Sequence, residues 1–179
     1  MMEKKNLPNH NQVLDVGSGL KPRGDVNVDL YIESIHRRGG KGPLLDVANT
    51  PGFVEADATD MYMFTDRQFS VVKCYHLMEH IDPPPARPSC WDLLRELWRV
   101  TGKHLIVEVP SRYWLKFPTW KRSKVHVSNF DHATFEKYVP QVLGTRNFEA
   151  VTKYRGIFNK MIPFPYWPHL VRLDVWRES

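Results

Sequence analysis

Residues 13–31 read VLDVGSGLKPRGDVNVDLY, and this stretch decides the fold that the sequence predicts. It begins with Val13–Val16, a short apolar run that ends in a glycine turn and is typical of a buried strand. A second run of the same kind, Val26–Leu30, follows closely. Only the six residues Leu20–Asp25, which include a proline and a glycine, separate the turn from this second run. A parallel crossover usually takes about a dozen residues, so we expect an extended loop there instead of a helix.

The rest of the chain alternates between strand-like and helix-like segments. Helical spacing of large apolar residues predicts a helix at Ser89–Val100, with Ser89 as its cap and Gly102 at its end. A second helix is expected to begin at Asp131, in DHATFEKYV. Further strands are expected at Phe53–Ala56, Phe69–Tyr75, His104–Val109, Phe148–Tyr154 and Leu170–Trp176. Strands interleaved with helices predict a mostly parallel sheet.

Length and composition favour one domain over residues 1–179. Hydrophobic residues make up 42% of the 179 residues, enough for a sizeable core. Residues 1–12 form a polar tail without the apolar segment of a secretory signal, and no apolar run approaches the roughly 18–20 residues of a membrane span. The two cysteines, Cys74 and Cys90, are typical of reduced thiols in a cytoplasmic protein. The net charge of +5 favours anionic partners weakly.

Glycines and acids follow successive strands of the predicted sheet. Gly17 and Gly19 have no Cβ, so a ligand can approach the backbone of their turn. Asp29 and Asp57 each follow a strand and can accept hydrogen bonds from a ribose diol and from an exocyclic amine. Two carboxylates suit a ligand with a ribose, an adenine and a positive charge, and they suit a pyrophosphate badly. The dinucleotide pattern G-x-G-x-x-G is also broken, because Pro22 stands where its third glycine would be.

A series of motifs resembles those of class I S-adenosylmethionine (SAM)-dependent methyltransferases of the type 11-like group. The motifs, in the family's order, are VLDVGSG, VNVDL, VEADATD, FSVVKCYHLMEHI and WDLLRELWRVTGKHLIVEVP. The resemblance implies a Rossmann-like, doubly wound α/β fold. Its mostly parallel, seven-stranded sheet would have an antiparallel last strand and helices on both faces, with the first crossover helix reduced or absent.

The resemblance also implies which residues hold SAM. The turn after the first strand would border the methionine part, Asp29 the ribose and Asp57 the adenine. The implied cofactor-binding residues are Asp15, Val16, Gly17, Ser18, Gly19, Asp29, Leu30, Asp57, Ala58 and Tyr75. Because the short crossover provides no helix N-terminus for the carboxylate of SAM, we expect Lys21 or Arg23 to supply the positive charge. His76 is a candidate general base for transfer of the methyl group to an unidentified acceptor.

The stretch HLMEH, His76 to His80, admits a metal-based alternative. It matches the zinc-protease pattern H-x-x-E-H, but Asp82–Pro85 would end the required helix at once. Some O-methyltransferases of this fold hold a divalent ion in an acid-x-x-Glu-His stretch, and His126 or His132 could add a ligand here. Because a histidine replaces the first acid, the sequence favours no metal ligand and an activity that survives EDTA.

Residues 110–130, PSRYWLKFPTWKRSKVHVSNF, are expected to form a lid over the acceptor. Their basic and aromatic residues would also fit a nucleic-acid groove, so the acceptor is either a small molecule or a nucleic acid. The stretch MIPFPYWPHL near the C-terminus could close the pocket or bury against a second subunit in a homodimer. The alternative function is non-catalytic: the same fold would bind an adenosyl ligand or a partner without transferring a methyl group.

Overall fold

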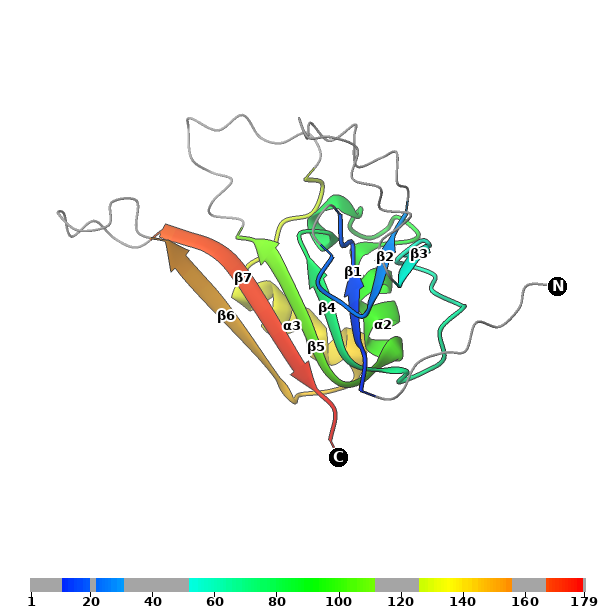
Figure 1. Cartoon of the computed structure of the whole chain (residues 1–179). Helices are drawn as coiled ribbons and strands as arrows, with labels where there is room; N and C mark the ends of the chain where they lie inside the picture. The colour runs from blue at the N-terminus through cyan, green and yellow to red at the C-terminus, as the bar shows by residue number, and fades with distance from the viewer. Residues whose placement is uncertain (1–10, 20–21, 31–51, 112–125, 156–166, 179) are drawn as a thin grey trace.

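The computed structural model describes residues 11–19, 22–30, 52–111, 126–155 and 167–178. These residues form a seven-stranded sheet with the strand order β3-β2-β1-β4-β5-β7-β6 (Figure 1). The strands are β1 (Val13–Val16), β2 (Val26–Asp29), β3 (Phe53–Glu55), β4 (Phe69–Tyr75), β5 (Thr101–Pro110), β6 (Phe148–Arg155) and β7 (Trp167–Trp176).

The sheet is parallel except for its last strand. The strands β1 to β5 pair with one another in parallel, whereas β7 runs antiparallel to both of its neighbours, β5 and β6. This arrangement confirms the predicted Rossmann-like, doubly wound α/β fold with an antiparallel last strand.

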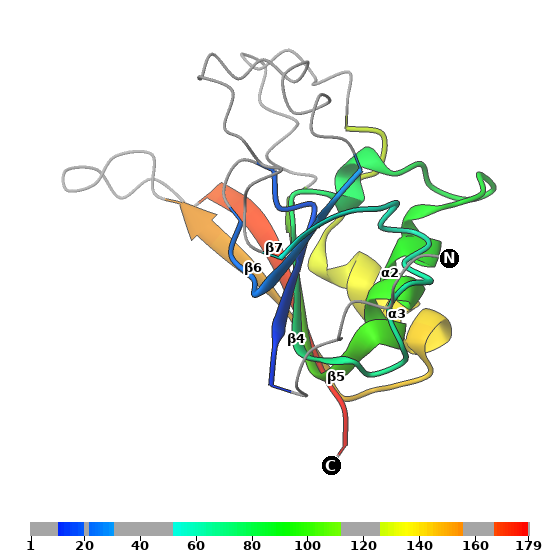
Figure 2. The same ribbon diagram turned by 45° about the vertical axis from the view of Figure 1, so that its right-hand side comes forward.

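The helices α2 (Cys90–Val100) and α3 (His132–Leu143) pack beside each other on one face of the sheet, as both views show (Figures 1 and 2). A single 3₁₀ turn, η2 (Met78–His80), follows β4. The predicted N-caps are confirmed, because the side chains of Ser89 and Asp131 accept hydrogen bonds from backbone amides of the first turns. Within the described residues no helix covers the opposite face, so the expectation of helices on both faces stays a prediction.

Two helix ends differ from the prediction. Gly102 does not end α2, because the chain turns directly from Val100 into extended backbone and Gly102 lies inside β5. The helix α3 continues through Pro140 to Leu143 and ends at Gly144, which adopts the left-handed conformation. Pro140 has no N–H, so it donates no backbone hydrogen bond within the last turn of α3.

The core lies between the sheet and the two helices. The apolar stripe of α2 buries Leu93, Leu94 and Leu97 completely, which is the outcome expected for an amphipathic helix on a sheet. Aromatic residues extend this core toward α3, where the rings of Phe130 and Phe135 stack with centroids 5.5 Å apart.

The crossover from β1 to β2 is an extended loop over its described residues 22–25, as predicted. It folds back onto β1: the Arg23 amide donates to Asp15 Oδ2 (2.8 Å) and the Asp25 amide to the Val13 carbonyl (2.8 Å). The side-chain amide of Asn27 accepts a hydrogen bond from the Gly24 N–H and donates one to the Gly24 carbonyl, both at 3.0 Å. A Cβ on Gly24 would lie 2.5 Å from the Val26 carbonyl oxygen and 2.7 Å from the Asp15 amide, so only glycine fits.

Several predictions fall outside the described residues. They concern Lys21, the polar tail, most of the proposed lid (112–125) and most of the aromatic stretch near the C-terminus. Among the helices that the structure does describe, none has the length and apolar character needed to cross a bilayer.

Candidate functional site

The candidate site lies along the carboxyl edge of the parallel strands. The chain moves outward from β1 to β2 and β3, and then returns to place β4 on the other side of β1. Ligands of doubly wound sheets bind at such a reversal of strand order, outside the carboxyl ends of the strands. The glycine turn after β1 and the segment Tyr75–His80 after β4 flank this position, and Asp29 and Asp57 extend it along the edge.

The glycine turn leaves space for a ligand, but its backbone amides already donate hydrogen bonds within the protein. The amides of Gly17 and Ser18 donate to the Val28 carbonyl (2.8 and 3.3 Å), and the Gly19 amide donates to Asp29 Oδ2 (3.0 Å). The backbone that a ligand was expected to approach therefore has its N–H groups already paired within the protein. Both glycines have positive φ, +71° and +54°. A Cβ on Gly17 would lie 3.0 Å from Leu77, whereas one on Gly19 would meet nothing within 4 Å.

Asp29 and Leu30 stand at the end of β2. The Asp29 carboxylate holds the glycine turn through Oδ2 and accepts from the Leu30 amide through Oδ1 (2.8 Å). A carboxylate has about four acceptor positions, so two of them remain for the hydroxyls of a ribose. Leu30 is 46% exposed and could pack against an adenine ring. Both residues lie where the sequence placed them.

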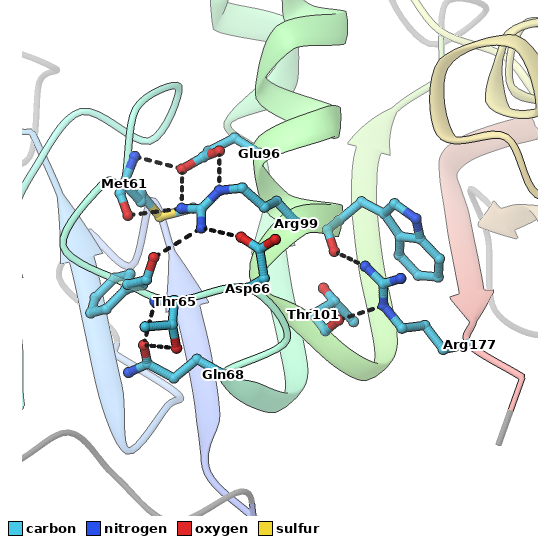
Figure 3. Close-up of polar contacts among 10 residues, drawn as sticks. Met61, Thr65, Asp66, Gln68, Glu96, Arg99, Thr101 and Arg177 are labelled. Carbon is cyan, nitrogen blue, oxygen red and sulfur yellow. Dashed lines mark hydrogen bonds and ion pairs between the residues drawn. The ribbon is translucent and has the colours of Figure 1, made fainter.

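Asp57 and Ala58 open the loop after β3, which a polar network holds against α2. Asp57 Oδ1 accepts from the Thr59 amide and hydroxyl (2.8 and 2.7 Å). Further along the loop, Arg99 donates to the carbonyls of Met61 and Phe64 and to Asp66, while the Met61 amide donates to Glu96 (Figure 3). The Arg99 network therefore fixes the loop that presents Asp57 at the carboxyl edge.

Asp15 is buried and serves the crossover loop. Its Oδ2 accepts a hydrogen bond from the Arg23 amide, which favours the charged carboxylate. Burial has the larger effect and raises the pKa of the carboxyl above its ordinary value. The guanidinium of Arg23 lies 4.8 Å from the ring centroid of Tyr75, at the end of β4. Burial raises the pKa of the Tyr75 hydroxyl. Arg23 thus brings a positive charge to the carboxyl edge, where the sequence predicted one, and Val16 is buried beneath the turn.

His76 occupies a strained position directly after β4. Its φ is +54°, unusual for a residue with a Cβ, and its amide donates to the Glu108 carbonyl (2.9 Å). The side chain is 49% exposed, and its Nδ1 lies 3.6 Å from Glu79 Oε1. The Glu79 carboxylate raises the pKa of His76 above its ordinary value, against the opposing effect of burial. Strain of this kind gathers at functional sites.

A second group of titratable side chains, which includes Glu79, lies next to His76. Glu79, His80 and His126 can place one ligand atom each so that all three lie within 4.8 Å of one another. Burial lowers the pKa of His126, although the Glu79 charge opposes the shift, so this imidazole favours its neutral form. The sequence named these residues only for its metal-based alternative, in which His132 was the other candidate. The described structure instead places His132 on the surface, 3.9 Å from Glu136 on α3.

Sequence reasoning missed the residues that shape the crossover. Asp25 accepts from the Val13 amide (2.8 Å) and Asn27 binds the backbone of Gly24. One signal was present: a short loop rich in Pro, Gly, Asp and Asn is typical of side chains that bind nearby backbone groups.

Comparisons with known proteins support the fold. No protein-family model matches the sequence, and no curated protein does. The structure is similar to a SAM-dependent methyltransferase from Archaeoglobus fulgidus, with a TM-score of 0.63 and 15% identity, over 93% of this chain and 86% of that chain. It is also similar to a Thermotoga maritima protein described as a SAM-dependent methyltransferase, possible histamine N-methyltransferase (TM-score 0.58, 14% identity, 97% of this chain and 84% of that chain). The chain therefore has the Rossmann-like fold of SAM-dependent methyltransferases.

The residues at the carboxyl edge fit an adenosyl ligand. Open space lies beside Gly19, and the buried hydroxyl of Ser18 finds no hydrogen-bond partner within the described residues. Asp29 has acceptor positions left, and Leu30 is an exposed apolar side chain beside it. Each of these features would be satisfied by a ligand that carries a ribose and an apolar ring.

Proposed function

We propose that this protein binds SAM at the carboxyl edge of its sheet and transfers the methyl group to an acceptor. The observation that carries the proposal is the joint placement of the glycine turn, Asp29 and Asp57 along the edge of a methyltransferase fold. Asp29 would accept from the ribose hydroxyls, Leu30 would pack against the adenine, and Asp57 and Ala58 would meet its edge.

Arg23 would hold the carboxylate of SAM in place of a helix N-terminus. Its guanidinium already lies over Tyr75 at the same edge, and a guanidinium can bind a carboxylate through two hydrogen bonds. Lys21 is the second candidate for this role. Asp15, Val16, Gly17, Ser18 and Gly19 would then border the methionine part, and Tyr75 the methyl group.

Bound SAM supplies a methyl group on a positively charged sulfur. A nucleophile attacks the methyl carbon in line with the carbon–sulfur bond, and S-adenosylhomocysteine leaves. The protein contributes mainly by aligning the two reactants, because a correctly oriented pair reacts far faster than one that meets by diffusion. His76, half exposed at the end of β4, would accept the proton that the nucleophile loses. Its Nδ1 faces Glu79, so its Nε2 is the nitrogen available for this role.

The acceptor would enter over the carboxyl ends of β4 and β5. Ser111 and Phe130, the residues on either side of the segment 112–129, pair here in an isolated parallel bridge. Its sequence is basic and aromatic, which supports an anionic acceptor, either a small molecule or a nucleic acid. A homodimer would be formed through the aromatic stretch near the C-terminus.

Cys74 and Cys90 support a cytoplasmic location. Both thiols are free and buried, and burial raises their pKa values above the ordinary value. Such thiols are unreactive core residues, as expected for a protein from a reducing compartment.

Turnover with labelled SAM tests the proposal. The purified protein is incubated with SAM that carries an isotope in its methyl group and with fractionated acceptor pools, one of small molecules and one of nucleic acids. We expect label to pass to one pool, and to pass much more slowly with His76→Ala than with the exposed control His132→Ala. Binding of SAM without transfer to any pool would instead support the non-catalytic alternative.

A further inference from the structure

We propose that Glu79, His80 and His126 form a binding site for one divalent transition-metal ion. Two imidazoles and one carboxylate converge here, with one ligand atom of each within 4.8 Å of the others. Imidazole nitrogen binds zinc, iron and nickel well, and a carboxylate completes a set of three protein ligands. Three protein ligands leave coordination positions for water or substrate, as in catalytic zinc sites.

Backbone hydrogen bonds hold the two halves of the site together. Glu79 and His80 belong to η2, whereas His126 lies far along the chain, beyond β5. The amides of Val127 and Ser128 both donate to the Glu79 carbonyl (2.9 and 3.1 Å), and the Ser128 hydroxyl donates to the Ile81 carbonyl (2.7 Å). These bonds fix the position of His126 relative to η2, so the site is preorganised by the backbone.

Two buried polar atoms of the site, one on Glu79 and one on His126, have no hydrogen-bond partner within the described residues. Glu79 is 2% exposed, and its Oε2 takes no hydrogen bond there, nor does the buried Nδ1 of His126. The imidazole nitrogens nearest to Glu79 Oε1 lie at 3.6 and 3.9 Å, too far for hydrogen bonds. Burying a carboxylate without such bonds is costly. A cation among the three side chains would satisfy both orphaned atoms.

The ligand chemistry favours a transition ion over magnesium. Magnesium prefers an octahedron of oxygens and keeps several waters, whereas this set offers two nitrogens for each carboxylate. The competing explanation is purely structural: Glu79 would be a buried anion balanced by protonated histidines around it. That explanation predicts no metal binding, so the two can be separated directly.

Metal binding at this site does not depend on the proposed methyl transfer. The site lies just beyond Tyr75 and His76, on the side where the acceptor would enter, and an ion there would favour an acceptor that carries an oxygen ligand such as a hydroxyl group. The sequence favoured no metal ligand here, and its expectation of an activity that survives EDTA stays a separate prediction.

Direct metal titration tests the proposal without SAM. The protein of residues 1–179 is stripped with EDTA, freed of chelator and titrated with Co²⁺ by visible absorption and with Zn²⁺ by calorimetry. We expect one ion per chain, with affinity at least tenfold lower in Glu79→Gln and in His126→Ala. Glu136→Gln and His132→Ala are matched controls, because this exposed pair lies on α3 and neither residue is among the three that converge. Both controls should keep the affinity of the unaltered protein.

Thermal unfolding provides a second readout that does not require a buried substitution. Zn²⁺ should raise the melting temperature of the unaltered protein and of both controls, but not that of His126→Ala, which replaces a partly exposed side chain. Absence of binding to the unaltered protein, or undiminished binding in both cluster variants, would overturn the site. Competition by an equal concentration of Mg²⁺ would overturn the choice of a transition ion. Calorimetry with SAM on the metal-free protein tests the proposed function separately.

Discussion

Asp29 has two tasks at the carboxyl edge, because it holds the Gly19 amide and would also accept from a ribose. Asp29→Ala should weaken SAM binding by roughly 1.5–3 kcal/mol, the value of hydrogen bonds to a charged group, or about 10- to 150-fold. Calorimetry measures this loss. Glu149→Ala removes an exposed carboxylate on β6, the edge strand farthest from β2 in the sheet, and should leave the affinity unchanged. Unchanged affinity in a folded Asp29→Ala variant would remove the central residue of the site.

The backbone strain at His76 can be measured by comparing the stabilities of His76→Gly and His76→Ala. In a regular position, glycine is less stable than alanine by about 0.5–1 kcal/mol. At a φ of +54° the order should reverse, because the left-handed region costs a residue with a Cβ about 1–2 kcal/mol. His76→Gly should therefore unfold at higher urea concentration than His76→Ala. The opposite order would show that residue 76 is not held in this conformation.

Sequence patterns placed the candidate site residues at the carboxyl edge of the sheet, since each lies at or after the end of a predicted strand. They did not show what those side chains bind within the protein. Asp15 accepts from the crossover backbone, and the amides of the glycine turn already have acceptors. A side chain can bind nearby backbone or a ligand with the same atoms, so residue type and spacing do not distinguish the two.

The crossover loop between β1 and β2 depends on the absence of a side chain at Gly24. Gly24→Ala would place a methyl group 2.5–2.8 Å from three backbone atoms. Because backbone atoms in a sheet cannot yield easily, we expect a loss of several kcal/mol in unfolding free energy, at the upper end for single substitutions. Urea denaturation measures it.

Gly19→Ala is the matched control for this loop. Its added methyl group meets nothing within 4 Å, so only the positive φ opposes it, at a cost of about 1–2 kcal/mol. If both variants were equally stable, the packing of Gly24 against β1 would be incorrect.

The capping box of α2 should make stability depend on pH. Asp92 accepts from the Ser89 amide (2.9 Å) and hydroxyl (2.7 Å), and these bonds lower the pKa of its carboxyl below the ordinary value of 3.8. A lowered pKa stabilises the folded state above the unfolded pKa, and this contribution is lost as the pH falls through the folded pKa. Asp92→Asn should therefore cost most near pH 6 and progressively less below about pH 4.

Urea unfolding between pH 3 and pH 7 measures this difference. Asp60→Asn is the control, because Asp60 is exposed and the described structure shows no hydrogen bond to its side chain. Asp60→Asn should change the free energy of unfolding at pH 6 much less than Asp92→Asn does. A cost for Asp92→Asn that grows as the pH falls would contradict the assigned cap.

Strands and N-caps were predictable, because buried apolar runs and capping residues are local signals. The ends of the helices were harder to predict. Pro140 looks like a helix breaker, yet α3 continues through it to Gly144. Gly102 looks like a helix end, yet a Cβ there would lie 2.9 Å from the Arg67 carbonyl oxygen. Tertiary packing explains Gly102, and no local pattern reports it.

At the scale of the whole molecule, the fold gathers distant residues that the sequence cannot bring together. The mostly parallel, seven-stranded sheet and its antiparallel last strand followed from the resemblance and are confirmed. The contact of His126 with η2 depends on how the chain returns after β5. Sequence spacing alone could not choose between His126 and His132 as a partner of Glu79.

Calorimetric titration of the purified protein with SAM and with S-adenosylhomocysteine tests the central claim most directly. The account predicts that both ligands bind at one site per chain. It also predicts that Asp29→Ala weakens both to a similar degree, because the two ligands share the ribose and the adenine. A folded protein that binds neither ligand, or one whose affinity for both is untouched in Asp29→Ala, would contradict the account.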